Sequence, residues 1–271
     1  MQNTYNNNEE QNIDIKSLIY ICLSHWYLFL AGAIIALSIS FFINRYTTNV
    51  YQVSGTVLVK ESKTHLDPTS IMTGSSYGTL QNLQNEMAII KSYSLIERVV
   101  KKMNLEVRYF EKGRVSTIEM YKTAPFTVEF DRSVPQTVGL TYEISILADG
   151  KIGLKAQSEY YKTYDFILCQ TVTSQPKTFE TKGEYTQGEW IDNGYNRMRI
   201  VLNEKFNKKT DPSRKMMFVI NDYSTLVKQM SSFSVSVANK QSSIASINTT
   251  GTNRQKIVDF TNMLLTEYVN R

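Results

Sequence analysis

Histidine is scarce in this chain: only His25 and His65 occur among its 271 residues. His25 lies in an apolar run and His65 in a polar segment, so no histidine cluster is available for a metal site or a catalytic triad. A phosphate-binding loop of the form G-x-x-x-x-G-K-[ST] is also absent. Aspartate and glutamate are scattered without the spacing of an acid–base pair. The sequence therefore predicts no catalytic residues, no metal ligands, no cofactor and no enzymatic activity in this chain.

Cysteine and clustered positive charge are lacking too. The two cysteines stand far apart, Cys22 in the apolar run and Cys169 in a strand-like segment, and we do not expect them to form a disulfide. Cysteine usage therefore does not reveal the compartment. The net charge is +5, but lysines and arginines are mixed with acids from Lys60 to Arg271 instead of forming a basic stripe. This pattern predicts no nucleic-acid partner.

The chain has a single long apolar run. From Leu18 to Ile43 there is no Asp, Glu, Lys or Arg, and about 26 helical residues at 1.5 Å each exceed a hydrocarbon layer of roughly 30 Å. Aromatic residues suit the two interfaces, with Trp26 and Tyr27 near one end and Phe42 near the other. A cleaved signal peptide would need a basic start and small residues at a cleavage site, which the acidic tail and the exit FFINRY do not supply. The run predicts an uncleaved membrane anchor.

This anchor is expected to divide the chain. Residues 1–12 are rich in Asn, Gln and Glu with little to bury, which predicts a disordered tail. Residues 13–46 are expected to form a juxtamembrane and transmembrane helix, and no comparable run follows, so the chain is predicted to cross the membrane once. Lys16 on one side and Arg45 on the other balance each other. The positive-inside rule therefore does not fix the orientation.

The chain enters its main domain as a strand. Residues 51–60 alternate apolar and polar side chains, which predicts a strand with one buried face. After a polar loop, apolar residues at helical spacing over 80–103 predict a helix pair or one bent helix. Ser94 and Glu97 have the spacing of a capping box, so we expect the second helix to begin there and to stop at Asn104.

Short alternating runs follow, which predict strands: LEVRYF, FTVEF, LTYEISIL, KIGLKA and MRIVL. Asp149 and Gly150, between LTYEISIL and KIGLKA, are predicted to form a hairpin turn because both residue types tolerate positive φ. Further patterns predict a strand at 216–221, a short helix from about Ser224, strands at 233–237 and 242–248, and a final helix over 257–268.

Four basic residues lie near the end of the first strand and the start of the last helix: Lys60, Lys63, Arg254 and Lys256. They could contact an anionic glycan or a lipid-phosphate headgroup, although a solvated surface is the simpler interpretation. Tyr160, Tyr161 and Tyr164 could likewise stack on sugar rings, while packing among strands is the simpler interpretation. The sequence leaves both pairs of alternatives open.

Four passages, in this order, resemble the chain length determinant (Wzz) domain of bacterial polysaccharide co-polymerases and of their tyrosine autokinase relatives. They are the pre-membrane helix and span DIKSLIYICLSHWYLFL, the strand YQVSGTVLVK, the helix NEMAIIKSYSLIERVVKKMNL, and the strand and helix SSIASINTTGTNRQKIVDFTNMLLTEYV. The intervening segment is longer than usual and is similar to the enlarged version in Bacteroidetes-type members. The resemblance implies an α+β fold: a transmembrane helix, a Wzz-like α/β domain formed by 47–108 and 215–271, an all-β insertion at 109–214, and a C-terminal helix.

The resemblance also implies a place and a role. The N-terminus would lie in the cytoplasm and the domain in the periplasm, anchored in a bacterial inner membrane. A homo-oligomer ring would set how long a capsular polysaccharide, exopolysaccharide or O-antigen grows, without catalysis by this domain. Its partners would be the lipid bilayer, a polysaccharide polymerase and the nascent polysaccharide.

Family members continue to a second membrane helix, and the kinase type adds an ATP-binding domain with a tyrosine tail. Neither is found in these residues, and the final helix stops at Arg271 without a cap, so we expect the chain to be cut short. Two alternatives stay open: the N-terminal periplasmic part of a tyrosine autokinase for exopolysaccharide export, and an anchored module that binds a glycan or a protein.

Overall fold

The computed structural model describes residues 16, 20, 23–59, 76–113, 116–147, 150–175, 178–203, 215–238 and 243–271. The chain divides into two compact units, Met1–Thr47 and Thr48–Arg271, and each is described by itself. Helices and antiparallel sheets occur together, as the predicted α+β class requires. The predicted tail, residues 1–12, lies outside the described residues.

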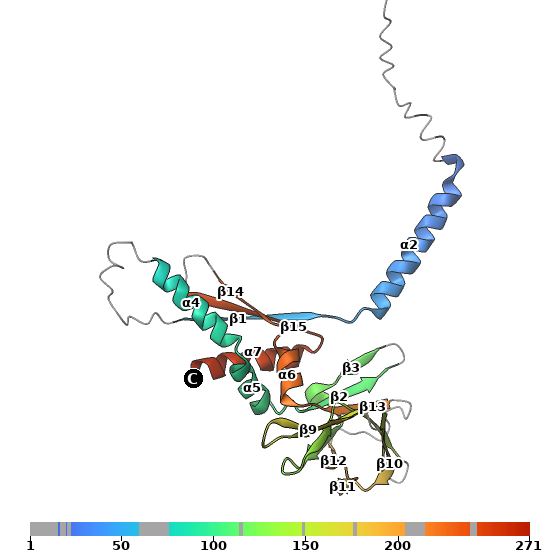
Figure 1. Ribbon diagram of the computed structural model, residues 1–271. Coiled ribbons are helices and arrows are strands. Elements are labelled where there is room, and N and C mark those ends of the chain that lie inside the picture. Colours follow the sequence, from blue (N-terminus) through green and yellow to red (C-terminus); the bar gives the residue numbers. More distant parts are fainter. Residues whose placement is uncertain are drawn as a thin grey trace, which may run out of the picture. The chain divides into compact units, whose positions relative to one another are not determined.

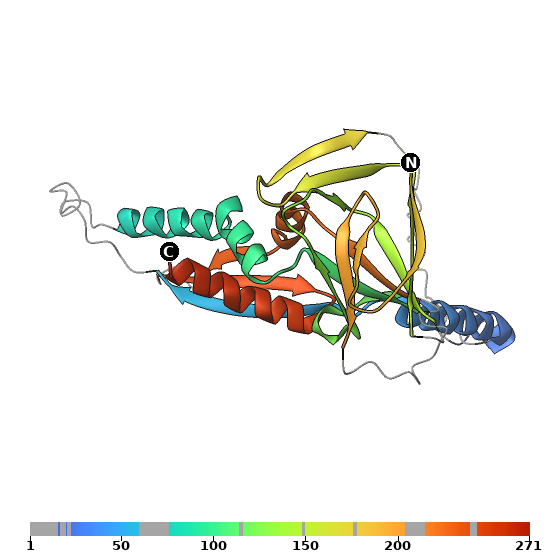
Figure 2. The ribbon, with the colours of Figure 1, turned by 90° about the horizontal axis from the view of Figure 1, so that it is seen from below.

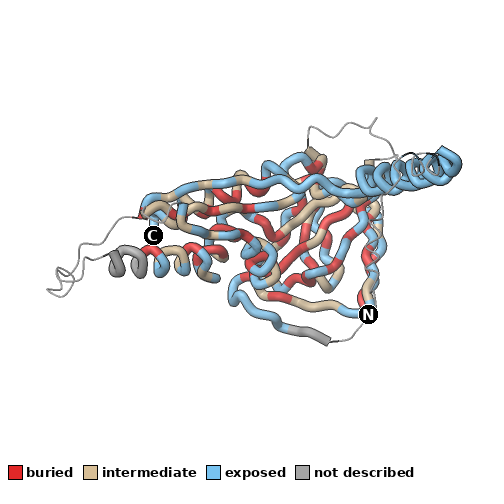
Figure 3. The backbone as a smooth tube through the Cα atoms, turned by 90° about the horizontal axis from the view of Figure 1, so that it is seen from above, coloured by how far each residue is buried: buried red, intermediate tan, exposed pale blue. Residues whose placement is uncertain are grey.

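The first unit contains one long apolar helix, α2 (Trp26–Tyr46) (Figure 1). At 1.5 Å per residue its 21 residues span about 30 Å, the thickness of a hydrocarbon layer. All of its residues are exposed (Figure 3). At its end the amide and hydroxyl of Thr47 both donate to the Ile43 carbonyl. Within the described part of the chain, α2 is the one helix long and apolar enough to cross a membrane.

The second unit begins with a three-stranded antiparallel sheet and a helix packed on it: β1 (Tyr51–Leu58), β14 (Ser234–Val237), β15 (Ile244–Gly251) and α7 (Arg254–Val269). The strand order is β1-β15-β14, and α7 runs along β1 and β15 (Figure 2). Gly55 permits this close packing, because a Cβ there would lie 2.9 Å from Leu265 Cδ1. The predicted first strand, last two strands and final helix are confirmed.

Three further helices complete this half of the unit: α4 (Ser76–Ile90), α5 (Tyr93–Lys102) and α6 (Tyr223–Met230). The predicted helix pair is confirmed, but the capping box at Ser94 and Glu97 is wrong. Ser92 caps α5: its backbone is extended and its Oγ accepts a hydrogen bond from the Leu95 amide at 3.3 Å. Asn104, with φ 49°, follows α5 in the left-handed conformation that commonly ends helices, as predicted.

The other strands form three more antiparallel sheets. Their bounds, with one short 3₁₀ helix, are β2 Val107–Lys112, β3 Thr117–Glu119, η1 Tyr121–Thr123, β4 Phe126–Phe130, β5 Gln136–Val138, β6 Thr141–Ile146, β7 Ile152–Ser158, β8 Tyr161–Asp165, β9 Gln170–Gln175, β10 Phe179–Tyr185, β11 Trp190–Asp192, β12 Arg197–Leu202 and β13 Lys215–Ile220. The orders are β10-β7-β6-β13-β2-β3, β11-β12-β4 and β5-β8-β9. Five of these strands, β2, β4, β6, β7 and β12, confirm the predicted alternating runs, and β13 confirms the strand predicted at 216–221.

The predicted limit between the insertion and the second part of the α/β domain, at residue 215, does not separate two sheets. Strand β13, the first element after this limit, lies inside the six-stranded sheet, with β2 on one side and β6 on the other. Phe218 of β13 is fully buried. Because β13 is hydrogen-bonded on one edge to β2 and on the other to β6, it belongs to the same sheet as the strands of residues 109–214.

The predicted hairpin at Asp149 and Gly150 is confirmed in its pairing. Strands β6 and β7 are antiparallel neighbours, with Ile146 opposite Ile152. Gly150 has φ +84°, whereas Asp149 lies outside the described residues. The amide of Leu147 donates to the carbonyl of Lys151 at 2.9 Å, so three residues form the connection instead of two.

Aromatic side chains fill the core of the β-rich part. The Tyr142 ring stacks on Phe218 with 4.8 Å between centroids, and Phe126 and Phe179 meet this pair edge-on. The buried Tyr142 hydroxyl donates to Asn196 Oδ1 at 2.6 Å. Among the described residues, every buried side-chain nitrogen and oxygen has a hydrogen-bond partner. The polar side chains in the core therefore keep their hydrogen bonds, and their burial leaves no unpaired donor or acceptor in the described residues.

Candidate functional site

Two adjoining cavities, of about 290 and 370 Å³, form a groove beside β2 and β4. We call it the β2–β4 groove. The cavities share four lining residues: Asn104, Val107, Tyr109 and Thr127. Strand β4 is the edge of its sheet here, and the Tyr109 hydroxyl accepts a hydrogen bond from the Val128 amide at 3.0 Å. Burial raises the pKa of Tyr109 and keeps it a neutral phenol.

One end of the groove carries a carboxylate between two cations. Glu119 Oε1 lies 2.9 Å from Arg108 Nε and 2.6 Å from Lys256 Nζ. The Lys256 residue is only 8% exposed, and Arg108 also donates to Gln229 Oε1 at 2.8 Å. The Asn253 amide donates to the Glu119 carbonyl, while its Oδ1 caps α7. This cluster joins α7 and α6 to the β2–β3 hairpin.

Burial and charge oppose each other in this cluster. Burial alone would raise the pKa of Glu119, but Lys256 and Arg108 outweigh it, and the pKa is lowered. Burial lowers the pKa of Lys256, and repulsion from Arg108 lowers it further. The attraction of Glu119 opposes this shift without cancelling it. The carboxylate gains from two cations, whereas the lysine shares one anion with a second cation. Glu119 is therefore the anion on which the cluster depends.

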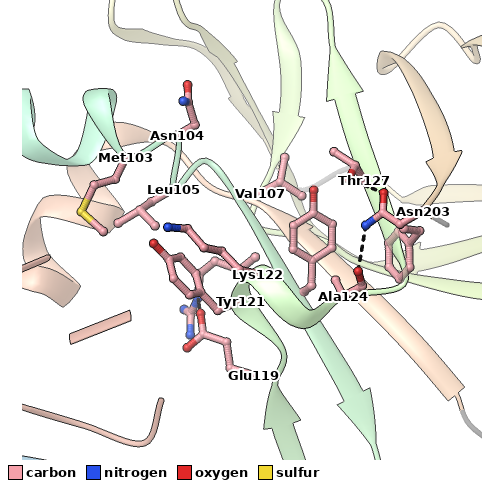
Figure 4. Close-up of a pocket in the computed structure, with 13 residues that line it drawn as sticks. Met103, Asn104, Leu105, Val107, Glu119, Tyr121, Lys122, Ala124, Thr127 and Asn203 are labelled. Atoms are coloured by element: carbon pink, nitrogen blue, oxygen red, sulfur yellow. Dashed lines mark hydrogen bonds and ion pairs between the residues drawn. The ribbon is translucent and has the colours of Figure 1, made fainter. Parts of the chain in front are cut away.

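A second tie between α7 and the groove lies next to the first. Asp259 of α7 accepts a hydrogen bond from the Tyr121 hydroxyl at 3.1 Å and pairs with Lys122 Nζ at 2.6 Å. Figure 4 shows Tyr121 and Lys122 beside Glu119, with Asn203 and Thr127 at the far end of the same cavity. Asn203 fixes that end by donating to the Ala124 carbonyl at 2.9 Å.

The other end of the groove is lined by Glu106, Arg132 and Trp190, among other residues. Glu106 is buried, and its Oε1 accepts from Arg132 Nη2 and from the Tyr223 hydroxyl, both at 3.0 Å. Burial raises the pKa of Tyr223, and the adjacent Glu106 adds to the shift. Trp190 remains 44% exposed. This end therefore combines a buried, paired carboxylate with an exposed arginine and an open aromatic ring.

A further ion pair fixes α6 to the β8 strand. Asp222 caps α6, and its Oδ2 pairs with Lys162 Nζ at 2.7 Å. Burial alone would raise the pKa of Asp222, but hydrogen bonds from Lys162, Ser224 and Thr225 lower it to about 2. The carboxylate is therefore ionised throughout the physiological range and serves as a structural anion.

The four predicted contact residues do not form one patch. Lys60 and Lys63 lie outside the described residues. Arg254 is exposed, so its contact with an anion stays a prediction. Lys256 is different: it is buried in the Glu119 cluster and not solvated, because its ammonium pairs with a carboxylate from the β2–β3 hairpin.

The predicted tyrosine run is divided between packing and solvent. Tyr164 is buried, and its ring lies edge-on to Phe166 with 5.0 Å between centroids. Tyr161 packs against Phe179 and Tyr195. Tyr160 is 49% exposed. Cys169, predicted in a strand, lies in the turn before β9 with φ 53°.

Sequence reasoning missed both ends of the groove. Glu119 and Lys256 are separated by 137 positions, and no local spacing connects them. Trp190 lies in a strand of three residues, too short to show a period of two. The one available signal was compositional, because Trp190 is one of only two tryptophans and the other, Trp26, lies in the apolar run.

Several carboxylates in and around the groove are paired with cations. Among the described residues, no group of three or more His, Cys, Asp or Glu side chains gathers as a metal site would require. The four carboxylates with a resolved shift, Glu119, Asp131, Asp222 and Asp259, all have lowered pKa values. A general acid needs the opposite shift. The arrangement therefore suits binding and positioning.

Comparison with known proteins bears on the N-terminal third of the chain. Residues 11–103 match the model of the family described as "Chain length determinant protein", Wzz. The match includes α2, β1, α4 and α5 and ends at Met103, the C-cap of α5. A search of curated proteins found no match. The predicted resemblance is confirmed for this part of the chain, since residues 11–103 match the Wzz family model.

Proposed function

We propose that this chain is a subunit of a polysaccharide co-polymerase that regulates the length of a capsular polysaccharide, exopolysaccharide or O-antigen without catalysing its synthesis. The observation that carries the proposal is the Wzz match over residues 11–103. The match includes α2, which is long and apolar enough to span a bilayer. The family match and a helix able to span a bilayer therefore coincide in the same segment.

The same two features support a proposed location for the chain. In this proposal α2 anchors the chain in a bacterial inner membrane, the N-terminus lies in the cytoplasm and residues 48–271 lie in the periplasm. Subunits confined to a membrane meet at high effective concentration, which favours assembly from weak contacts. Identical subunits usually close into symmetric assemblies. A homo-oligomer ring beside a polymerase is therefore the expected working form.

The carboxylates of the described domain support a non-catalytic role. Glu106, Asp222 and Glu267 are buried, Glu119 is partly buried, and each pairs with at least one lysine or arginine. A glycosyl-transfer acid would need a raised pKa and access to substrate. These carboxylates instead hold neighbouring segments of the fold together, as Glu267 of α7 does by pairing with Lys102 of α5. Control of polymer length would then come from the shape of the assembly and from its contacts with the polymerase and the growing chain.

Deletion of the gene tests the proposal. Surface polysaccharide from deletion and parent cells is separated by size on gels, and the deletion strain is complemented with the full chain. The proposal expects the parent's modal length to disappear in the deletion strain and to return on complementation. An unchanged length distribution would contradict it and would favour an anchored module that binds a glycan or a protein.

A further inference from the structure

The outer face of the β11-β12-β4 sheet has an ordered set of polar and aromatic side chains. Trp190 lies opposite Arg199, and Arg199 lies opposite Glu129, so one row crosses all three strands. In the next row Asp192 lies opposite Arg197, which pairs with Asp131 at 3.4 Å. We call this surface the Trp190 face.

The opposite face of the same sheet belongs to the core. Phe126, Val128, Ile191, Met198 and Ile200 alternate with the residues of the Trp190 face and are buried. Because side chains alternate along a strand, the fold fixes which residues reach solvent. On β11 the side chain of Ile191 is buried on the core side, whereas Trp190 leaves a large apolar ring on the solvent side.

Trp190 is held in place and still open. The guanidinium carbons of Arg199 and Arg197 lie 5.2 and 5.8 Å from its ring centroid, within the range of cation–π contact. Arg199 is itself fixed by Glu129, with Nε to Oε2 at 2.7 Å. The ring nevertheless stays 44% exposed. It is therefore a rigid aromatic surface beside groups that can donate and accept hydrogen bonds.

We propose that the Trp190 face is a glycan-binding subsite, in which a pyranose ring stacks on Trp190 while its hydroxyls bond to the arginines and carboxylates around it. This rests on the proposed function, since the ligand is a segment of the surface polysaccharide. The subsite adjoins the 370 Å³ cavity that Trp190, Glu129 and Arg132 line, so neighbouring sugar units have space to continue into the β2–β4 groove.

The charge balance identifies the class of glycan. Arg199 pairs with Glu129, Arg197 with Asp131 and Arg132 with Glu106. With Asp192 added, four acids stand on and beside the face against three arginines. A densely anionic polymer therefore gains no net electrostatic attraction. Hydroxyl groups, in contrast, match paired carboxylates and guanidiniums, which present acceptors and donors side by side. The expected ligand is an uncharged or sparsely charged oligosaccharide.

The test uses the full chain in a detergent without a sugar headgroup. The probe is the set of oligosaccharides released by mild acid from the producing cells' own surface polysaccharide. Trp26→Phe leaves Trp190 as the sole tryptophan, so a saturable change in its emission reports binding at this ring. Titration calorimetry compares Trp190→Ala, Trp190→Phe and the matched control Tyr51→Ala, which removes a similarly exposed ring, 41% exposed, from β1 in another sheet.

We expect Trp190→Ala to weaken binding about tenfold, the upper end for loss of one aromatic contact. Trp190→Phe should lose less and Tyr51→Ala nothing, with unchanged circular dichroism in all three. Equal affinity of Trp190→Ala and the parent would overturn the proposal. So would binding only of a sulfated dextran fragment, or a change in subunit assembly without a change in glycan affinity.

Failure of the subsite and failure of the proposed function remain distinguishable. If Trp190→Ala binds the oligosaccharides normally but gene deletion abolishes the modal length, the subsite is refuted and the co-polymerase role stands. If Trp190→Ala loses binding but deletion leaves polymer length unchanged, the subsite stands in an anchored binding module and length regulation is refuted.

Discussion

Replacing Glu119 by glutamine tests whether the buried cluster holds α7 to the β2–β3 hairpin. The substitution leaves Lys256, with its ammonium buried, beside Arg108 and without its anion. Loss of one partner of a buried pair costs about 3–5 kcal/mol. Glutamine keeps an acceptor oxygen, so we expect the lower end, about 3 kcal/mol.

That loss can be converted to a melting temperature. For a unit the size of Thr48–Arg271, about 1 kcal/mol shifts the Tm by about 2–4 °C, so Glu119→Gln should lower it by roughly 6–12 °C. The assay is thermal unfolding of the full chain in detergent, followed by far-ultraviolet circular dichroism. The control is Glu119→Leu with Lys256→Met, which removes the anion and the buried ammonium together while Arg108 keeps its hydrogen bond to Gln229, and it should lose less stability than Glu119→Gln.

The pH dependence gives an independent check. The pKa of Glu119 is lowered in the folded chain, so its stabilising contribution is complete above the unfolded pKa of about 4.3 and is lost as pH falls through the lower folded value. The difference between parent and Glu119→Gln should therefore be constant near neutrality and shrink in acid. A Tm loss below about 2 °C, or a loss that does not shrink in acid, would refute the reasoning.

Three further predictions concern local elements. Ser92→Ala should lower the free energy of unfolding by about 1 kcal/mol by removing the α5 cap, while Ser94→Ala should change it little, as measured by urea denaturation. Gly150→Ala should cost about 1–2 kcal/mol in the same assay, because φ is +84° there although no atom lies within 4 Å of the added Cβ. Ile35→Arg in α2 should disfavour membrane insertion by about 3 kcal/mol and increase the fraction released by alkaline extraction of membranes.

Each of these predictions has an opposing outcome. Equal losses for Ser92→Ala and Ser94→Ala would contradict the position of the helix cap. A neutral or stabilising Gly150→Ala would show that the turn does not need a left-handed residue. Full membrane retention of Ile35→Arg, with Ser38→Ala as a mild control in the same helix, would argue against a spanning α2.

Periodic segments of the sequence predicted their own structure well. The apolar run became α2, the alternation at 51–60 became β1, and the apolar face of the last helix became the part of α7 that packs on the sheet. These elements carry their information locally, because burial on one face imposes a period of two or 3.6 residues. The helix stop at Asn104 was also predictable from local information, because asparagine tolerates the left-handed conformation in which helices commonly end.

Contacts between distant residues were not predictable. Lys256 looked like a surface cation, because its partner Glu119 lies 137 positions away. Ser94 matched the capping pattern, yet Ser92 has the extended backbone that a cap requires. Strand β13 was predicted to begin the second part of the α/β domain, and only the pairing with β2 and β6 places it within the six-stranded sheet. Pairing between distant segments decides the environment of Lys256 and the place of β13, and the backbone conformation decides which serine caps α5.

The length distribution of the surface polysaccharide, measured together with its total amount, tests the central claim most directly. Polymer from parent, deletion and complemented cells is separated by size-exclusion chromatography with light scattering, and total sugar is assayed in parallel. A non-catalytic length regulator predicts that deletion cells still make polymer, but with a broad distribution that becomes narrow again on complementation. Disappearance of the polymer, or an unchanged distribution, would contradict the proposed function.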